Sequence, residues 1–174
     1  APADAAPLWA EFADETGERG YQNLARFRQA AALEKAGKPN EAVNVLEGLA
    51  GSAGNETLQG LAKLKAGMIL VDSVSYDDLA NRLAGMDTAQ SPWRNQVREL
   101  LAVSALSEER YQDAADHLRP ITADPDASGG VRSRAHVLYA MVSPHLSQDD
   151  QTATQDETAQ AAEPAAAPTS TQSE

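Results

Sequence analysis

One pattern of apolar residues recurs three times along this chain and constrains its fold more than any other feature. Each occurrence is a triple in which the second residue follows the first by four positions and the third follows the second by three. This spacing places all three side chains on one face of an α-helix. Successive triples begin 37 and 35 residues apart. The triples are Ala42, Leu46 and Leu49; Leu79, Leu83 and Met86; and Ala114, Leu118 and Ile121.

The interval between triples is close to the roughly 34-residue period of tetratricopeptide repeats, in which each unit is a pair of helices. A small first residue, Ala42 or Ala114, would let the second helix of a unit approach the first closely, and the two larger residues would fill the space to the next unit. Leu79 is not small, so we expect the middle unit to be atypical. The predicted fold class is all-α, a tetratricopeptide-like α-solenoid of about three helix pairs plus terminal helices. A plain helical bundle would produce the same stripes.

Capping and helix-breaking residues divide the chain between these stripes. Gly37 with Pro39 ends one helix and starts the next. Asn55, Ser75 and Ser91 each precede an apolar stripe as an N-cap, and proline follows Ser91 directly. No stretch alternates as a half-buried strand does, so no sheet is predicted. The predicted helices span about 7–16, 21–36, 39–49, 58–71, 76–86, 92–105, 111–121 and 131–142.

The composition predicts a helical domain between two unstructured ends. Residues 1–6 form a flexible lead-in, residues 7–143 the helical domain, and residues 144–174 a disordered tail. The tail is rich in Gln, Thr, Ala and Pro, has no aromatic residue, and has one aliphatic residue larger than Ala, Leu146. Such a segment buries too little apolar area to offset the loss of chain entropy.

The charge of the chain excludes two classes of partner. The formal net charge is −12, and six acidic residues with no Lys or Arg follow position 144. An acidic protein lacks the basic face that nucleic acids and anionic membrane surfaces require. The longest apolar run, residues 66–71, is far shorter than the roughly 20 residues of a spanning helix. The chain begins without Met, so an anchor or signal upstream would not be visible.

No residues with a catalytic or metal-binding pattern were found, and we predict no enzyme activity and no cofactor. The chain has no cysteine and only three histidines, His117, His136 and His145. Asp113 precedes His117 by one helical turn, but one carboxylate and one imidazole do not make a metal site. The acidic residues around Glu108 and Glu109 are better explained as a solvated helix start than as an acid–base pair.

Four segments together resemble a known family. They are YQNLARFRQAAALEKAGKPNEAVNVLEGLA, LAKLKAGMILVD, SPWRNQVRELLAVSALSEERYQDAADHLRPI and VRSRAHVLYAMV. Over about residues 21–142 the chain resembles the tetratricopeptide-like domain of the ancillary subunit of the bacterial SecYEG translocon. The most specific pieces are the Pro-Trp-Arg sequence at 92–94 and the group Arg132, Arg134 and Ala135. The resemblance implies a periplasmic domain tethered to the inner membrane by an N-terminal helix that this chain lacks. It does not extend to the acidic tail.

The first helices of the pairs are where binding is expected, because these helices line the concave face of a tetratricopeptide array. A basic stripe from Arg28, Lys35, Lys63 and Lys65 could border that face. The candidate face consists of Phe27, Ala31, Leu64, Met68, Gln96, Glu99 and Val103, although its apolar members could equally be core residues.

These observations predict a non-catalytic protein-binding module. Through the resemblance, the expected role is an accessory of Sec-dependent export that holds or hands over newly translocated chains, with translocon components, exported clients or chaperones as partners. A scaffold that bridges partners in an envelope or cell-division complex is the alternative. A small helical enzyme or regulator is a third possibility, from a different class.

Overall fold

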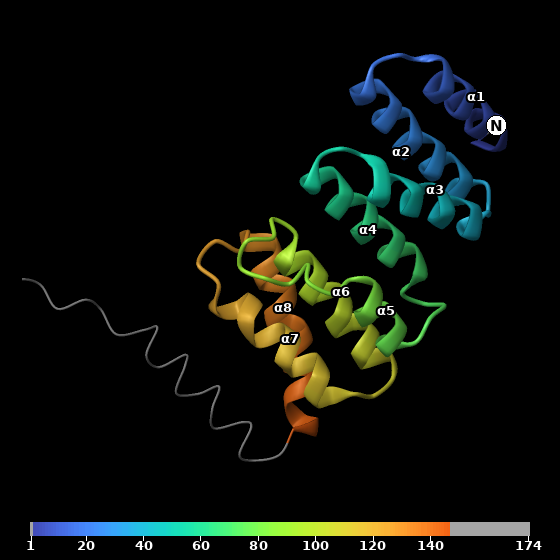
Figure 1. Cartoon of the computed structure of the whole chain (residues 1–174). Helices are drawn as coiled ribbons and strands as arrows, with labels where there is room; N and C mark the ends of the chain where they lie inside the picture. Colours follow the sequence, from blue (N-terminus) through green and yellow to red (C-terminus); the bar gives the residue numbers. More distant parts are fainter. Residues whose placement is uncertain (1, 147–174) are drawn as a thin grey trace, which may run out of the picture.

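The chain folds into a stack of helices (Figure 1). The computed structural model describes the backbone of residues 2–146 and the side chains of residues 5–146, and no strand occurs in that part of the chain. The all-α prediction is therefore confirmed. The elements are α1 Pro2–Glu15, α2 Arg19–Lys35, α3 Pro39–Ser52, α4 Glu56–Leu70, α5 Tyr76–Arg82, α6 Arg94–Ser107, α7 Tyr111–Ala123, α8 Gly129–Val142 and the 3₁₀ turn η1 Ser143–His145.

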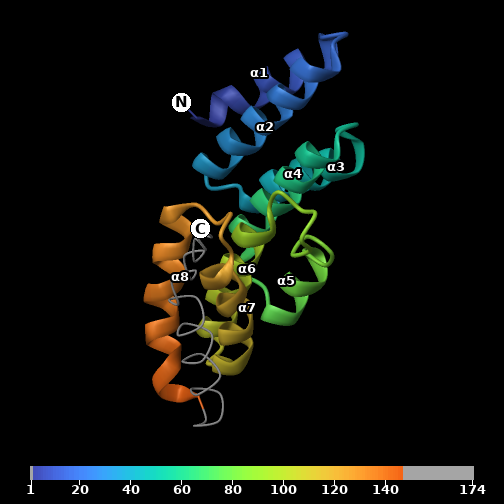
Figure 2. The same cartoon turned by 90° about the vertical axis from the view of Figure 1, so that its left-hand side faces the viewer.

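Consecutive helices pack against each other in two blocks. Helices α1 to α4 form one block and α6 to α8 the other, while α4 meets α5 and α6 over a smaller area. Figure 2 shows α1 and α2 lying obliquely above α7 and α8, which run upright. The stack therefore turns where α4 passes its neighbours α5 and α6.

Two turns of the stack have the same backbone structure, 72 positions apart. After α2, Gly37 adopts a left-handed φ of 75°, and the N–H of Lys38 donates to the Leu33 carbonyl at 2.9 Å. After α6, Glu109 adopts a φ of 59°, and the N–H of Arg110 donates to the Ala105 carbonyl at 2.9 Å. Both are Schellman turns, which satisfy the last carbonyls of a helix and reverse the chain. The pairs α2–α3 and α6–α7 are therefore equivalent repeat units.

The middle unit, α4–α5, departs from this pattern. Its second helix has only seven residues, and its turn lacks the left-handed residue. The Ser75 hydroxyl instead accepts from the N–H of Asp78 at 3.1 Å and caps α5 as the sequence predicts. Leu79 is fully buried at the position that Ala42 and Ala114 hold in the other units. It lies beside Gly67 of the facing helix α4, where a Cβ would be 3.4 Å from Cδ1 of Leu79.

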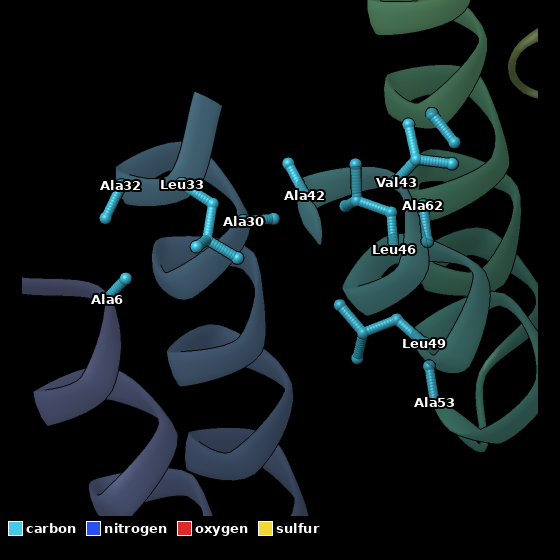
Figure 3. Packing of buried hydrophobic residues seen from close by; sticks show 11 residues of the cluster. Ala6, Ala30, Ala32, Leu33, Ala42, Val43, Leu46, Leu49, Ala53 and Ala62 are labelled. Carbon is cyan, nitrogen blue, oxygen red and sulfur yellow. The ribbon is translucent and has the colours of Figure 1, made fainter. Parts of the chain in front are cut away.

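All nine residues of the recurrent triples are buried. Figure 3 shows the first triple, with Ala42 near Ala30 of α2, and Leu46 and Leu49 between α3 and its neighbours. In the described part of the chain the interior divides into a cluster within α1–α4, one between α4 and α6, and one within α6–α8. Each unit therefore packs mainly on its sequence neighbours, as a solenoid does.

Both ends of the domain differ from the prediction. Residues 2–6, expected to be a flexible lead-in, are the first turn and a half of α1, and Ala6 is buried against the α1–α4 cluster. Alanine favours helix, and Pro2 is acceptable at a first helical position. At the other end, η1 extends the fold and Leu146 is buried in the α6–α8 cluster, so the domain continues past residue 143. The remainder of the predicted tail, 147–174, lies outside the described residues.

Two glycines of α4 set how closely the two blocks approach. A Cβ on Gly60 would lie 2.6 Å from Cδ1 of Trp93, and the Trp93 indole N–H donates to the Thr57 carbonyl at 3.0 Å. A Cβ on Gly67 would lie 3.1 Å from Cδ2 of Leu100 on α6. The two glycines are seven residues apart and thus lie on one face of α4. This face is the contact surface between the blocks.

Gly60→Ala should destabilise the protein because the added methyl group overlaps the Trp93 ring. Overpacking typically costs about 1–3 kcal/mol. The better helix propensity of Ala offsets up to about 1 kcal/mol of this cost. The melting temperature should fall by about 2–6 °C in differential scanning calorimetry. Gly48→Ala is the matched control, because Gly48 lies in α3 with nothing within 4 Å of its Cβ position. That variant should melt at the same temperature or higher, and an equal fall in both would contradict the role assigned to Gly60.

Glu109→Gly should stabilise the α6–α7 turn. A left-handed conformation costs a residue with a Cβ about 1–2 kcal/mol, and glycine avoids this cost. Glycine loses more chain entropy on folding, which offsets part of the gain. We expect a gain of about 0.5–1 kcal/mol in the free energy of unfolding, measured by urea titration. The reciprocal change, Gly37→Ala in the equivalent turn, should lose about as much. A destabilised Glu109→Gly variant would show that the Glu109 side chain makes an essential contact.

Candidate protein-binding groove

Helix α2 buries mainly small residues, with Leu33 as its one large buried apolar residue, and leaves Leu24 and Phe27 partly exposed. Its buried positions are Asn23, Ala25, Ala30, Ala32 and Leu33, so most of its core face is alanine. Leu24 remains 51% exposed, and Phe27 is only half-buried. Large apolar side chains normally supply the core of a helix pair. On α2, Leu24 and Phe27 instead line a surface groove, and Phe27 also packs against the α1–α4 cluster.

The groove lies between α2 and α4, the first helices of the first two units. A hollow of about 450 Å³ is lined by Leu24, Phe27 and Ala31 from α2 and by Leu58, Leu61 and Lys65 from α4, together with Gly20, Asn23 and Arg28. A second hollow, of about 190 Å³, adjoins it through shared residues Phe27, Ala31 and Lys65 and ends at Met68 and Glu34. We call the two together the α2–α4 groove. Its walls are mainly aliphatic and aromatic carbon, as in sites that hold apolar groups.

Two cations, one from each helix, line the α2–α4 groove. Arg28 of α2 and Lys65 of α4 are exposed and have no ion pair among the described residues. Lys63 does not share this position, although we expected it in the same basic stripe. It lies on the other side of α4, where it lines two different hollows. Lys63 and Lys65 are two residues apart, which places their side chains about 200° apart around the axis of α4.

A hollow of about 420 Å³ on that other side is a weaker candidate. It lies where α3, α4 and α5 meet and is lined by Glu47, Lys63, Arg82 and Gly67, among others. Arg82 donates to Glu47 across it, so these two charges neutralise each other. Gly67 is one of the contact residues between the blocks. This hollow is therefore explained by the packing of the stack.

The predicted binding face divides into three parts. Phe27, Ala31 and Met68 line the α2–α4 groove, with Met68 60% exposed. Leu64 is buried in the cluster between α4 and α6, so it is a core residue and cannot contact a ligand. On α6, Gln96 is half-buried and Val103 exposed, while Glu99 accepts from Arg134 of α8 at 2.8 Å.

Three large apolar residues that line the larger hollow were missing from the predicted face: Leu24, Leu58 and Leu61. They belong to the same helical stripes as Phe27 and Met68, so the spacing was visible in the sequence. Spacing alone could not show which stripe faced solvent.

A polar cluster joins α5 to the second block. The N–H of Tyr76 donates to Oε1 of Glu108 at 2.7 Å, and its hydroxyl lies 2.8 Å from Nε2 of His117. The Arg110 guanidinium covers the Tyr76 ring at 4.1 Å and donates to Asp77 and Asp113. Of the acids near this turn, Glu108 and Asp113 are thus held in structural contacts. Burial lowers the pKa of His117, and burial, followed by the charge of Asp113, raises the pKa of Tyr76.

The residues that carry the family resemblance are structural. Nε of Arg94 and Nδ2 of Asn95 both donate to Asp124, at 2.9 and 2.7 Å. The hydrogen bond from Asn95, the N–H of Asp126 and the Arg94 guanidinium lower the pKa of Asp124. Arg132 donates to three carbonyls of the same loop, and Ala135 is fully buried. These residues fix the start of α6 and α8 and leave the α2–α4 groove to other positions.

The described residues do not form a recognisable metal site. Within residues 2–146, no group of three or more His, Asp or Glu side chains is arranged to hold a metal ion. None of the helices in this part of the chain combines the length and apolar character needed to cross a bilayer.

Comparison with known proteins identifies one family. A family model described as a tetratricopeptide repeat-like domain matches residues 1–118, more than half of the chain. The match covers α1 to α6 and most of α7, and therefore includes the whole α2–α4 groove. Searches of curated proteins and of solved structures found no match.

His117→Gln should make the stability of the protein depend less on pH between about pH 7.5 and 5. Because burial lowers the folded-state pKa of His117 below its usual 6.5, the wild-type fold is more stable above pH 6.5 and loses stability as the pH falls through the folded-state pKa. The variant lacks this titration, so its melting temperature should fall less over the same range. Parallel slopes for wild type and His117→Gln would contradict the assignment.

Proposed function

The chain belongs to the tetratricopeptide repeat-like domain family, and from this premise we propose that it binds apolar segments of other proteins in the α2–α4 groove. The single observation that carries the proposal concerns α2. This helix buries mainly alanines, while its larger residues Leu24 and Phe27 line an open groove. Across that groove α4 adds the exposed Met68. Methionine adapts its shape to different apolar partners, which suits a site that accepts varied sequences.

We propose further that these partners are exported chains and that the domain acts as a periplasmic accessory of Sec-dependent export, tethered through a segment upstream of Ala1. This finer role is supported by the resemblance of residues 21–142 to the translocon subunit family. An apolar groove on a non-catalytic repeat domain also suits transient holding of unfolded chains. The alternative, a scaffold that bridges fixed partners of an envelope complex, predicts no affinity for unfolded clients.

Met68→Ser should weaken binding of an unfolded client. Losing roughly half of a buried methionine's apolar contact costs about 1 kcal/mol, so the dissociation constant should rise about fivefold. The client is reduced, carboxymethylated α-lactalbumin, and the measurement is fluorescence anisotropy. Met141→Ser on α8 is the matched control, because Met141 is 59% exposed and Met68 is 60% exposed.

The outcomes separate the alternatives. Weaker binding by the Met68 variant alone supports the groove. Equal weakening by both variants would indicate non-specific apolar contact. A wild-type chain that neither binds the client nor slows its aggregation would rule out the holding role and favour the scaffold.

A further inference from the structure

The α2–α4 groove differs in charge from the protein around it. The chain has a net charge of −12, yet the two charged side chains that line the larger hollow, Arg28 and Lys65, are both cationic. Most other arginines of the described part are held by carboxylates or carbonyls of the chain itself. Examples are Arg26 with Asp14, Arg94 with Asp124, and Arg132 with its three carbonyls. Arg28 and Lys65 are thus available to a ligand.

The cations lie on the two opposite helices of the groove, with apolar residues between them. Arg28 follows Phe27 on α2, and Lys65 lines both hollows from α4. Glu34, which lines the end of the smaller hollow near Met68, is the one carboxylate on the lining. The positive charge is therefore concentrated around Leu24, Phe27 and Leu61, and the end near Met68 is mixed. A ligand that lies along the groove would place its acidic groups against the larger hollow.

We propose that the α2–α4 groove selects acidic partner segments in which large apolar side chains alternate with Asp or Glu. The inference rests on the proposed function and adds the charge class of the bound segment. The apolar side chains would fill the space beside Leu24, Phe27 and Leu61, and the carboxylates would pair with Arg28 and Lys65. Complementary charges of this kind speed encounter and exclude partners of the wrong sign more than they add affinity.

Two segments of this chain share part of that chemistry and fit less well. Residues 147–174 are acidic and carry no Lys or Arg, but they contain no aliphatic residue larger than Ala and no aromatic residue to occupy the apolar walls. Helix α1 exposes Leu8 and Phe12 beside acidic residues. However, α1 is already packed along α2, and Asp14 is paired with Arg26. A separate protein that supplies both features is the better match.

The test uses the full chain and four labelled peptides, with dissociation constants from fluorescence anisotropy. The first peptide alternates pairs of Glu with Phe and Leu. The second replaces each Glu by Lys, and the third replaces each Phe and Leu by Ser. The fourth is residues 147–174. We expect only the first to bind well, and its binding to weaken when NaCl is raised from about 50 to about 500 mM, because salt screens exposed charges.

Charge reversal locates the effect on the groove. Lys65→Glu and Arg28→Glu should each weaken the first peptide about fivefold, and the double variant more than about tenfold, as expected for exposed ion pairs replaced by repulsion. Lys63→Glu is the matched control, because it makes the same charge change on the same helix but on the other side of α4. It should leave the dissociation constant within about twofold. Lys65→Gln provides a milder change, and unchanged melting temperatures confirm the fold of each variant.

The result can separate this inference from the proposed function. If the Glu and Lys peptides bind equally and Met68→Ser weakens both, the groove binds apolar segments without charge selection, and the inference is overturned while the proposed function stands. If none of the peptides and no unfolded client binds, both fail. Tight binding of the 147–174 peptide would instead assign the groove to the chain's own tail. Sedimentation as a dimer that Phe12→Ser dissolves would assign it to a second copy.

Discussion

The contact of α4 with α5 and α6 is the constraint on which the rest of the structure depends. The two blocks each have their own apolar cluster and are joined through a third, smaller cluster between α4 and α6. That contact is close because Gly60 and Gly67 leave room for Trp93 and Leu100. Since α4 presents this face to the second block and packs Ala62 and Ala66 into the α1–α4 cluster, a third side of the helix is left to form a wall of the groove with α2. The same helix therefore determines both the joint of the stack and the position of the candidate binding site.

The use of small residues links packing to function in this protein. Alanines at Ala25, Ala30 and Ala32 let α2 lie close to α1 and α3, and Ala42 does the same from α3. Leu24 stays exposed, and Phe27 is only half-buried at the edge of the α1–α4 cluster. These larger side chains form the groove wall, where the apolar area that the core does not use is available to a partner.

Polar contacts have a different task, which is to fix the relative positions of the helices. Tyr76 connects α5 to Glu108 in the α6–α7 turn and to His117 on α7, while Asp124 connects the starts of α6 and α8. The second network includes Arg94 and Arg132, two of the residues from which the sequence analysis predicted a resemblance to the translocon subunit family. Such a resemblance therefore reports how the stack is built. What the groove binds depends on the side chains that the stack leaves exposed.

The sequence by itself determined the order of the helices and the nine interior positions of the triples, because helical periodicity and caps at Gly37, Asn55 and Ser75 are local properties. Two predicted helix ends were wrong: α5 ends at Arg82, short of 86, and α6 begins at Arg94 with Trp93, not Ser91, as its N-cap. The sequence also indicated Phe27, Ala31 and Met68 as residues of a binding face. Only the tertiary structure decided that Leu64 belongs to the core and that Ala6 packs against the α1–α4 cluster. It also decided that α2 turns its alanines inward and Leu24 outward. The physical reason is that an apolar stripe shows that a helix packs, whereas the neighbouring helices decide which face is covered.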